Sequence, residues 1–257
     1  MQPLDRNLRL ERNLGALRER ITRAAVRSGR GADDVRLVAV TKSVDVETIR
    51  LLRELGLRDF GENRVQQLAR RAEALGADVS GFESARDPQA PRWHMIGHLQ
   101  RNKVKPLLGQ CRIVHSVDSA RLANEIEARM ESLARDQRDH ADVLLEVNLS
   151  REEHKSGAPQ CEAPQLAEQI SALPRIRLCG LMTMASLAGD SRAVRGVFAG
   201  LRELLERLRS SGAVDENCRE LSMGMSNDYT VAVEEGATIV RVGSALFAGL
   251  ESTNSHA

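Results

Sequence analysis

The stretch Val35-Arg36-Leu37-Val38-Ala39-Val40-Thr41 is short and rich in β-branched and apolar residues, as expected of a strand. It is followed by Val46–Glu54, where apolar residues recur three or four positions apart, the spacing of an amphipathic helix. Strands that alternate with helices in this way are typical of parallel sheets. The number of such units along the chain therefore decides the fold.

Eight runs of this kind follow one another from residue 35 onward. They are Val35–Thr41, Leu57–Gly61, Arg92–Gly97, Arg112–Val117, Asp142–Leu149, Arg177–Thr183, Arg219–Met223 and Thr238–Gly243. The helical patterns between them are Val46–Glu54, Arg64–Leu75, Ala120–Ala134, Pro164–Leu173, Ala193–Arg209 and Tyr229–Glu235. Eight units predict an α/β fold, a single (β/α)8 barrel of the TIM type over residues 1–257. An open doubly wound sheet is the alternative, but the chain has no GxGxxG after the first strand and no GxxxxGK[ST].

The segments outside this rhythm are short. Residues 1–30 predict a helix packed on the barrel, with apolar residues at roughly helical spacing: Leu4, Leu8, Leu14, Leu17 and Ile21. No apolar run there is long enough for a signal sequence or a membrane span. Residues 76–91 are rich in Gly, Asp, Ser and Pro and predict a loop, and residues 250–257 predict a tail.

Composition excludes several classes of protein. Lys and Arg total 37 against 36 for Asp and Glu, and aromatic residues make up 2% of the chain, so neither a basic footprint nor stacking platforms for nucleic acid are present. The cysteines, Cys111, Cys161, Cys179 and Cys218, form no CxxC pair and no Cys/His cluster at metal spacing, so neither a metal site nor a disulfide framework is predicted. Scattered free thiols favour a cytoplasmic protein.

Lys42 is the first candidate for chemistry. It directly follows the apolar run Leu37-Val38-Ala39-Val40, and active sites of such barrels lie where the strands end. We expect a partly buried lysine at the barrel mouth, where its amine could attack an aldehyde. A strand-end lysine that only extends its charge into solvent is the alternative.

The ends of the seventh and eighth runs predict a phosphate site. They read Leu221-Ser222-Met223-Gly224-Met225-Ser226 and Arg241-Val242-Gly243-Ser244, two small-residue turns that we expect to lead into helices. Backbone N–H groups and hydroxyls at such a place can hold a phosphate, and barrels often put it after strands seven and eight. The eighth strand neighbours the first, so this site and Lys42 should share one side of the mouth. That arrangement suits pyridoxal 5′-phosphate (PLP), whose aldehyde and phosphate lie on opposite sides of a small ring.

With these motifs in order, the chain resembles the PLP homeostasis proteins (the YggS/PROSC family), which are similar to the N-terminal barrel of alanine racemase. The resemblance spans nearly the whole chain. It is carried by LVAVTK ending at Lys42, FGENRVQ around Asn63, WHMIGHLQRNK from Trp93 to Lys103, HSVD ending at Asp118, HKSG around Lys155, GLMTM from Gly180, LSMGMSND from Leu221 and RVGSALFAG from Arg241.

The resemblance implies a set of cofactor-binding residues. Lys42 would carry PLP covalently as a Schiff base, and Arg241 would face the pyridine nitrogen. Around the phosphate it implies Ser222, Gly224, Gly243 and Ser244, and along the ring Asn63 and Met182. His94 and His98 are expected to have supporting or structural roles, and Lys155 is either a solvated loop lysine or a second aldehyde acceptor. One departure from the family is Val44, where many relatives carry a second lysine, and Thr41 replaces a common serine.

The resemblance implies a PLP carrier rather than an enzyme, with no catalytic residues. Racemases of this type use a tyrosine from a second, β-rich domain as the second base, and this sequence shows no such domain. An arginine at the ring nitrogen also disfavours carbanion stabilisation. The protein would buffer vitamin B6 cofactor and release it to apo-enzymes, acting as a monomer without nucleic acid or membrane. Two alternatives stay open: a PLP-dependent enzyme such as a slow amino-acid racemase or decarboxylase, and an interaction protein that senses PLP.

Overall fold

A computed structural model describes residues 3–75, 90–133, 140–150, 156–186 and 189–250. Its strands are β1 (Arg36–Val40), β2 (Asp59–Glu62), β3 (Arg92–Met95), β4 (Ile113–Val117), β5 (Ala141–Asn148), β6 (Ala158–Pro159), β7 (Ile176–Met182), β8 (Glu220–Ser222) and β9 (Ile239–Val242). All strand pairs in the described residues are parallel, and eight of the strands follow the eight predicted runs. β6 is an addition of two residues that pairs with β5 alone.

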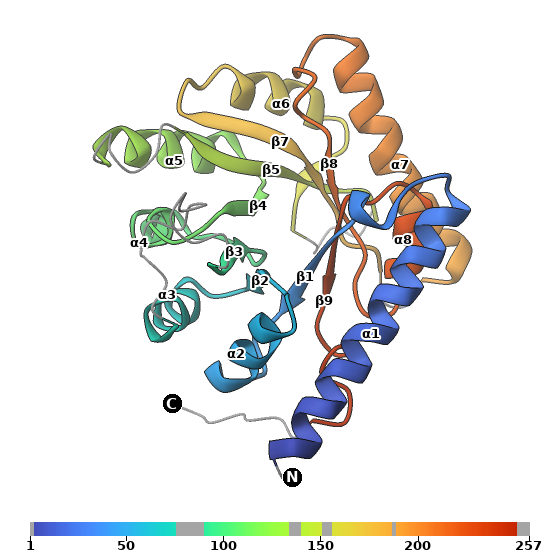
Figure 1. Cartoon of the computed structure of the whole chain (residues 1–257). Helices are drawn as coiled ribbons and strands as arrows, with labels where there is room; N and C mark the ends of the chain where they lie inside the picture. Colours follow the sequence, from blue (N-terminus) through green and yellow to red (C-terminus); the bar gives the residue numbers. More distant parts are fainter. Residues whose placement is uncertain (1–2, 76–89, 134–139, 151–155, 187–188, 251–257) are drawn as a thin grey trace.

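The sheet closes into a barrel (Figure 1). Its order is β4-β3-β2-β1-β9-β8-β7-β5, and a further pairing of β4 with β5 joins the two edges. β1 lies between β2 and β9, with Arg36 opposite Ile239 and Ala39 opposite Val242. The prediction of a closed (β/α)8-type barrel is confirmed, and the C-terminal ends of β8, β9 and β1 meet on one side of the mouth.

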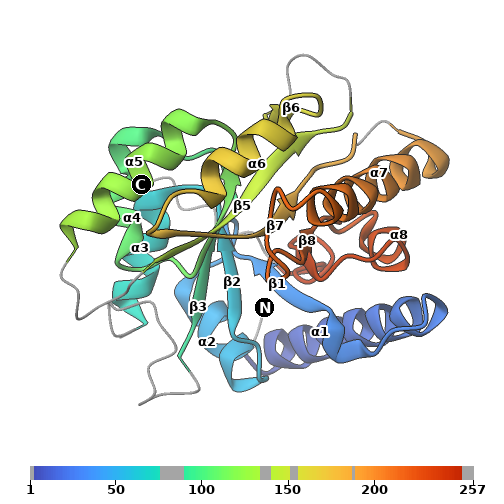
Figure 2. The same ribbon diagram turned by 90° about the horizontal axis from the view of Figure 1, so that it is seen from above.

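Helices surround this barrel in chain order (Figure 2). They are α2 (Val46–Glu54), α3 (Val65–Ala74), α4 (Val104–Leu108), α5 (Ala120–Ser132), α6 (Ala163–Ser171), α7 (Ser191–Ser210) and α8 (Tyr229–Glu234), with short 3-10 turns η1 (Ala32–Asp34) and η2 (Arg101–Lys103). Residues after β9 form turns instead of the expected helix, because Leu246 and Phe247 both donate their N–H to the carbonyl of Gly243.

The first helix, α1 (Pro3–Arg27), fills the gap that this leaves in the ring of helices (Figure 2). It contacts α8 through the ion pair of Arg27 with Glu234 and α2 through that of Arg6 with Asp45. Asn13 donates to the carbonyls of Leu246 and Ala248, so α1 also binds the turns that follow β9.

The buried face of α1 differs in part from the predicted one. Leu14, Leu17 and Ile21 are buried as expected, together with Leu10, whereas Leu8 is 58% exposed. Leu8 precedes Leu10 by two positions, which is more than half a helical turn, so both cannot face the barrel. None of the helices in the described ranges is long and apolar enough to cross a membrane.

Two cores fill the molecule. The larger one lies between the barrel and its helices, where the outward faces of the strands meet the apolar stripes of the helices. The smaller one lies inside the barrel and consists of Val38, Ile113, Leu144, Met182 and Ile239. Ion pairs of strand residues accompany it toward the N-terminal ends of the strands, among them Arg92 with Asp59 and Arg177 with Asp142.

Candidate cofactor-binding site

The turn that carries Lys42 is clamped from the side of α3. Arg71, buried on α3, donates to the carbonyl of Thr41 at 2.7 Å and to the carbonyl of Val44, so it binds the turn before and after Lys42. The same guanidinium pairs with the buried carboxyl of Glu62, which also accepts the hydroxyl proton of Thr41. The clamp therefore fixes the backbone on both sides of Lys42.

Lys42 itself is exposed. The expectation of a partly buried amine is wrong, because β1 ends at Val40 and the turn places Lys42 at the rim of the mouth. The hydroxyl of Thr41 donates to the buried carboxyl of Glu62. Burial raises the pKa of Glu62, although the charge of Arg71 and the hydrogen bonds from Thr41 and Arg71 oppose it.

A cradle of backbone N–H groups lies beside this turn. Gly243 and Ala245 both donate their N–H to Oγ of Ser226 at 3.2 Å. At Gly243 a Cβ atom would lie 3.2 Å from Cβ and from the carbonyl oxygen of Val40, so the glycine lets the end of β9 approach the end of β1 closely. The cradle is therefore packed against the residue two positions before Lys42.

The residues predicted around the phosphate separate into three places. Gly243 belongs to the cradle, and Ser244 is exposed in the adjoining turn. Gly224 has φ +93°, and a Cβ there would lie 2.6 Å from Cβ of Ala232, so this glycine lets the end of β8 pack on α8. Ser222 lies inside the barrel and is fully buried. Sequence reasoning missed Ser226, although it is the second serine of the quoted SMGMS motif.

Arg241 is buried in β9 on the inner side of the barrel. Its Nη1 donates to Oγ of Ser222 at 2.5 Å, and its Nη2 donates to the carbonyl of Thr183 at 3.1 Å. Burial lowers the pKa of Arg241 to about 10, against the opposing charges of Glu146 and Asp228. The guanidinium is thus still protonated at neutral pH, and two hydrogen bonds hold it in place.

The hydroxyl of Ser222 leads to two buried histidines. Nδ1 of His115 lies 2.8 Å from Oγ of Ser222, and Nε2 of His115 lies 2.9 Å from Nδ1 of His94. Nε2 of His94 in turn lies 2.9 Å from Oδ1 of Asp59. His94 thus has a structural contact, as expected, but His115 and Asp59 were not identified from the sequence.

Glu146 is a second residue that sequence reasoning missed. It is 2% exposed in β5, and burial and the charge of Asp118 raise its pKa to about 7, while Arg241 opposes the rise. A single acid within the apolar run VLLEV was the available signal. It is the carboxyl that most strongly opposes the lowering of the Arg241 pKa.

Two further predicted residues lie at different depths. Met182 is part of the inner-barrel cluster, and it pairs in register with Ser222 on β8, the strand next to the one that carries Arg241. Asn63 is exposed directly after β2, and a Cβ at Gly97 would lie 2.5 Å from its carbonyl oxygen, so the end of β3 packs on its backbone. Lys155 lies outside the described residues.

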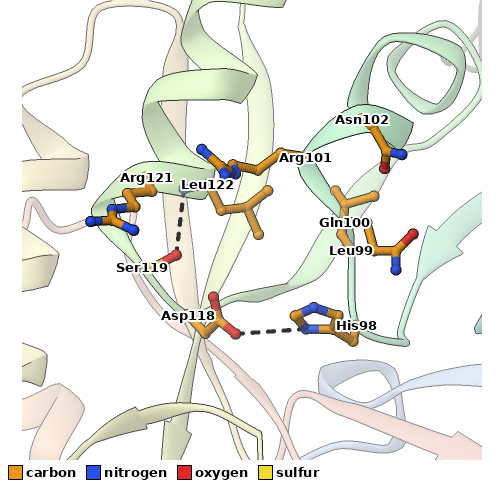
Figure 3. A pocket seen from close by; sticks show the side chains of 9 residues that line it. All are labelled: His98, Leu99, Gln100, Arg101, Asn102, Asp118, Ser119, Arg121 and Leu122. Atoms are coloured by element: carbon orange, nitrogen blue, oxygen red, sulfur yellow. Dashed lines mark hydrogen bonds and ion pairs between the residues drawn. The ribbon is translucent and has the colours of Figure 1, made fainter.

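A cavity of about 510 Å³ opens where β3 and β4 end (Figure 3). His98 lies on one side of it, 3.7 Å from the carboxylate of Asp118, and Arg101 and Arg121 line it from the segments after β3 and β4. The N-cap Ser119 accepts the N–H of Leu122 and completes the start of α5. His98 is therefore a partner of Asp118 at the surface. The described residues contain no group of three or more His, Cys, Asp or Glu that could hold a metal ion.

Comparisons with known proteins identify the family of this barrel. Residues 12–251 match the family described as "Alanine racemase, N-terminal domain". The pyridoxal phosphate homeostasis protein of Aquifex aeolicus is 41% identical over 235 residues, which cover 91% of this chain and 95% of that protein. A structure of an unknown protein from Bifidobacterium adolescentis has a TM-score of 0.86 at 37% identity and covers 96% of this chain and 97% of its own.

A third similar structure is that of PipY from Synechococcus elongatus PCC7942 with PLP bound. It has a TM-score of 0.76 at 30% identity and covers 93% of this chain and 99% of its own. The family model, the curated relative and the fold all point the same way. The chain belongs to the pyridoxal phosphate homeostasis protein family, whose barrel is that of the alanine racemase N-terminal domain.

Proposed function

We propose that this protein binds PLP at the barrel mouth, holds it as a Schiff base on Lys42, and stores and releases it in the cytoplasm without turning over a substrate. Apo forms of PLP-dependent enzymes are the proposed recipients. Four cysteines that are all free in the structure support a reducing compartment.

The observation that carries the proposal is the position of three groups around the contact of β9 with β1. Lys42 follows β1, the N–H cradle of Gly243 and Ala245 packs on Val40, and the buried guanidinium of Arg241 lies within β9. An amine for the aldehyde, backbone donors for a phosphate and a fixed cation for the ring nitrogen are the groups that PLP requires. The residues present therefore fit the cofactor, and the similar structure of PipY has PLP bound.

Lys42, Arg241 and the cradle would divide the work. The Nζ of Lys42 would bond the aldehyde carbon, and Gly243, Ala245 and Ser226 would bind the phosphate, with the exposed Ser244 beside them. Asn63 and Met182 would line the ring. PLP supplies an electrophilic aldehyde and a ring that can accept electrons from a bound amine.

Two features support a carrier over an enzyme. Arg241 stays charged at neutral pH, and a permanent cation at the ring nitrogen disfavours its protonation, which weakens the ring as an electron acceptor. The sole tyrosine, Tyr229, is buried among the residues between barrel and helices, and its hydroxyl has no hydrogen-bond partner within the described ranges. It does not supply the second base that two-base racemisation needs.

We expect the purified protein mixed with PLP to be yellow, to lose this absorption on borohydride reduction, and to leave the Cα hydrogen of L-alanine in place. The measurement is deuterium uptake at Cα in deuterated water, monitored by NMR, with PLP alone as the control. Uptake or D-alanine well above that control would overturn the carrier and establish the enzyme.

A change at the cradle should separate the phosphate from the ring. Ser244→Asp puts a carboxylate beside the N–H groups of Gly243 and Ala245, and it would repel the phosphate dianion. We expect at least a tenfold loss of PLP affinity and little change for pyridoxal, which has no phosphate. Ser210→Asp, at an exposed position at the end of α7, is the matched control. Equal losses for the two ligands would place the phosphate elsewhere.

A further inference from the structure

A continuous line of hydrogen bonds crosses the interior of the barrel. It runs from Asp59 on β2 through His94 on β3 and His115 on β4 to Ser222 on β8 and Arg241 on β9. The four heavy-atom distances are 2.9, 2.9, 2.8 and 2.5 Å. We call these five residues the inner chain. All five are buried, at 5% exposure or less, although polar groups inside a barrel are costly unless they are paired.

The two ends of the inner chain determine which way each hydrogen bond points. Burial favours the neutral form of Asp59, but the hydrogen bond from His94 and the charges of Arg92 and Arg36 outweigh it and lower the pKa of this carboxyl. Burial lowers the pKa of both histidines, so the rings are neutral at pH 7. A carboxylate can only accept hydrogen bonds, and a guanidinium can only donate them.

From these two ends the remaining protons follow. His94 donates a hydrogen bond from Nε2 to Asp59, so its Nδ1 must be an acceptor. Nδ1 of His94 therefore accepts a hydrogen bond from the N–H at Nε2 of His115. Nδ1 of His115 is then an acceptor, and the hydroxyl of Ser222 donates a hydrogen bond to it. The oxygen of Ser222 is left to accept from Nη1 of Arg241. Each of the four links then pairs one donor with one acceptor. Successive hydrogen bonds that point the same way strengthen one another.

This direction has a consequence for Arg241. A free serine hydroxyl rotates and could turn its proton toward the guanidinium, which would repel it. Here the hydroxyl of Ser222 donates its hydrogen bond to His115, so only the lone pairs of the oxygen face Arg241. The carbonyl of Thr183 holds the other terminal nitrogen. The orientation of the Arg241 guanidinium is thus fixed by Ser222, His115 and Thr183 inside the barrel.

We infer that Asp59, His94 and His115 are positioning residues for PLP binding: through Ser222 they fix the guanidinium of Arg241 in the orientation that recognises the pyridine nitrogen. The inference rests on the proposed function. It assigns the inner chain to the ring nitrogen, apart from the phosphate cradle and from Lys42.

The test uses two ligands that differ only at the ring nitrogen: PLP and 1-deaza-PLP, in which a C–H group replaces that nitrogen. Arg241 can hydrogen-bond the first and not the second. We expect His115→Phe to weaken PLP binding at least tenfold and 1-deaza-PLP binding less than threefold. With ¹⁵N-labelled PLP, the chemical shift of the ring nitrogen should also differ between the variant and the unmodified protein.

Two further variants make the comparison decisive. His115→Gln keeps a donor toward His94 but offers no ring acceptor to Ser222, and it should show the same difference between ligands if His115→Phe does not fold. Asp142→Asn removes a carboxyl that is buried at the same end of the barrel but outside the inner chain, and it should affect both ligands alike.

Equal losses for PLP and 1-deaza-PLP in a folded His115 variant, or no loss for either, would overturn the inference. Failure of the proposed function looks different. In that case the unmodified protein gives no borohydride-reducible chromophore with PLP, and both proposals fall together. A normal chromophore with no difference between the two ligands would overturn only the role inferred for the inner chain.

Discussion

Lys42→Ala should abolish the reducible chromophore while the protein stays folded. The sequence contains four lysines, Lys42, Lys103, Lys105 and Lys155, so few amines compete for the aldehyde. The side chain of Lys42 is exposed, so its loss should change the free energy of unfolding by less than about 0.5 kcal/mol. We expect peptide mapping after borohydride reduction to find the pyridoxyl group on Lys42 in the unmodified protein and on no lysine stoichiometrically in the variant.

Lys105→Ala is the matched control, because Lys105 is also an exposed lysine but lies in α4, on the outside of the barrel. It should keep full labelling at Lys42. Labelling that stays stoichiometric in Lys42→Ala, or that maps chiefly to Lys155 in the unmodified protein, would show that the amine has been assigned to the wrong lysine.

Arg241→Ala should destabilise the fold even without cofactor. The change leaves the carbonyl of Thr183 and the hydroxyl of Ser222 without their buried donor, and it removes the cation that opposes the raised pKa of Glu146. Each buried acceptor that loses its donor costs about 1 to 3 kcal/mol. We expect a loss of this size in urea unfolding at pH 7, together with loss of PLP binding.

The pH dependence of this loss can be stated with its sign. The pKa of Glu146, about 7 in the folded protein and 4.5 ordinarily, should rise further when Arg241 is absent. A carboxyl whose folded-state pKa is raised costs no stability below its unfolded pKa, and the cost grows as pH rises toward the folded pKa. Arg241→Ala should therefore be less damaging at pH 5 than at pH 8. Arg192→Ala, at an exposed arginine in the first turn of α7, should change stability little at either pH. A flat difference across this range would rule out the coupling of Arg241 to Glu146.

The strands were predictable because their runs are short, β-branched and separated by helical spacing. α4 was not predicted, since its five residues contain Pro106 and span little more than one turn, too short to show a period. The helix that the sequence predicts after β9 is replaced by turns in the structure. RVGSALFAG contains good helix formers, but Gly243 accepts hydrogen bonds that form a turn instead.

The site was predictable only as far as local motifs reach. Lys42 and Gly243 belong to short stretches whose place in a barrel follows from strand order. The inner chain joins residues 35, 21, 107 and 19 positions apart. Ser222 and Arg241 belong to motifs that were recognised, whereas Asp59 and His115 alone look like ordinary polar residues near a strand. Only closure of the barrel brings them together, so no sequence spacing announces them.

The closure of β1 on β9 also sets an order of events during synthesis. Val38 pairs with Arg241, which is about two hundred positions later in the chain. Asn13 of α1 donates to the carbonyl of Leu246, so this contact cannot form until Leu246 has been synthesised. Contacts so distant in sequence form late, because the ends of a long loop must first meet. Nearly all of the described chain must therefore be synthesised before Lys42, Arg241 and the N–H cradle can come together. If the proposed function holds, a nascent or truncated product should leave PLP free in solution, and only a finished barrel should bind it.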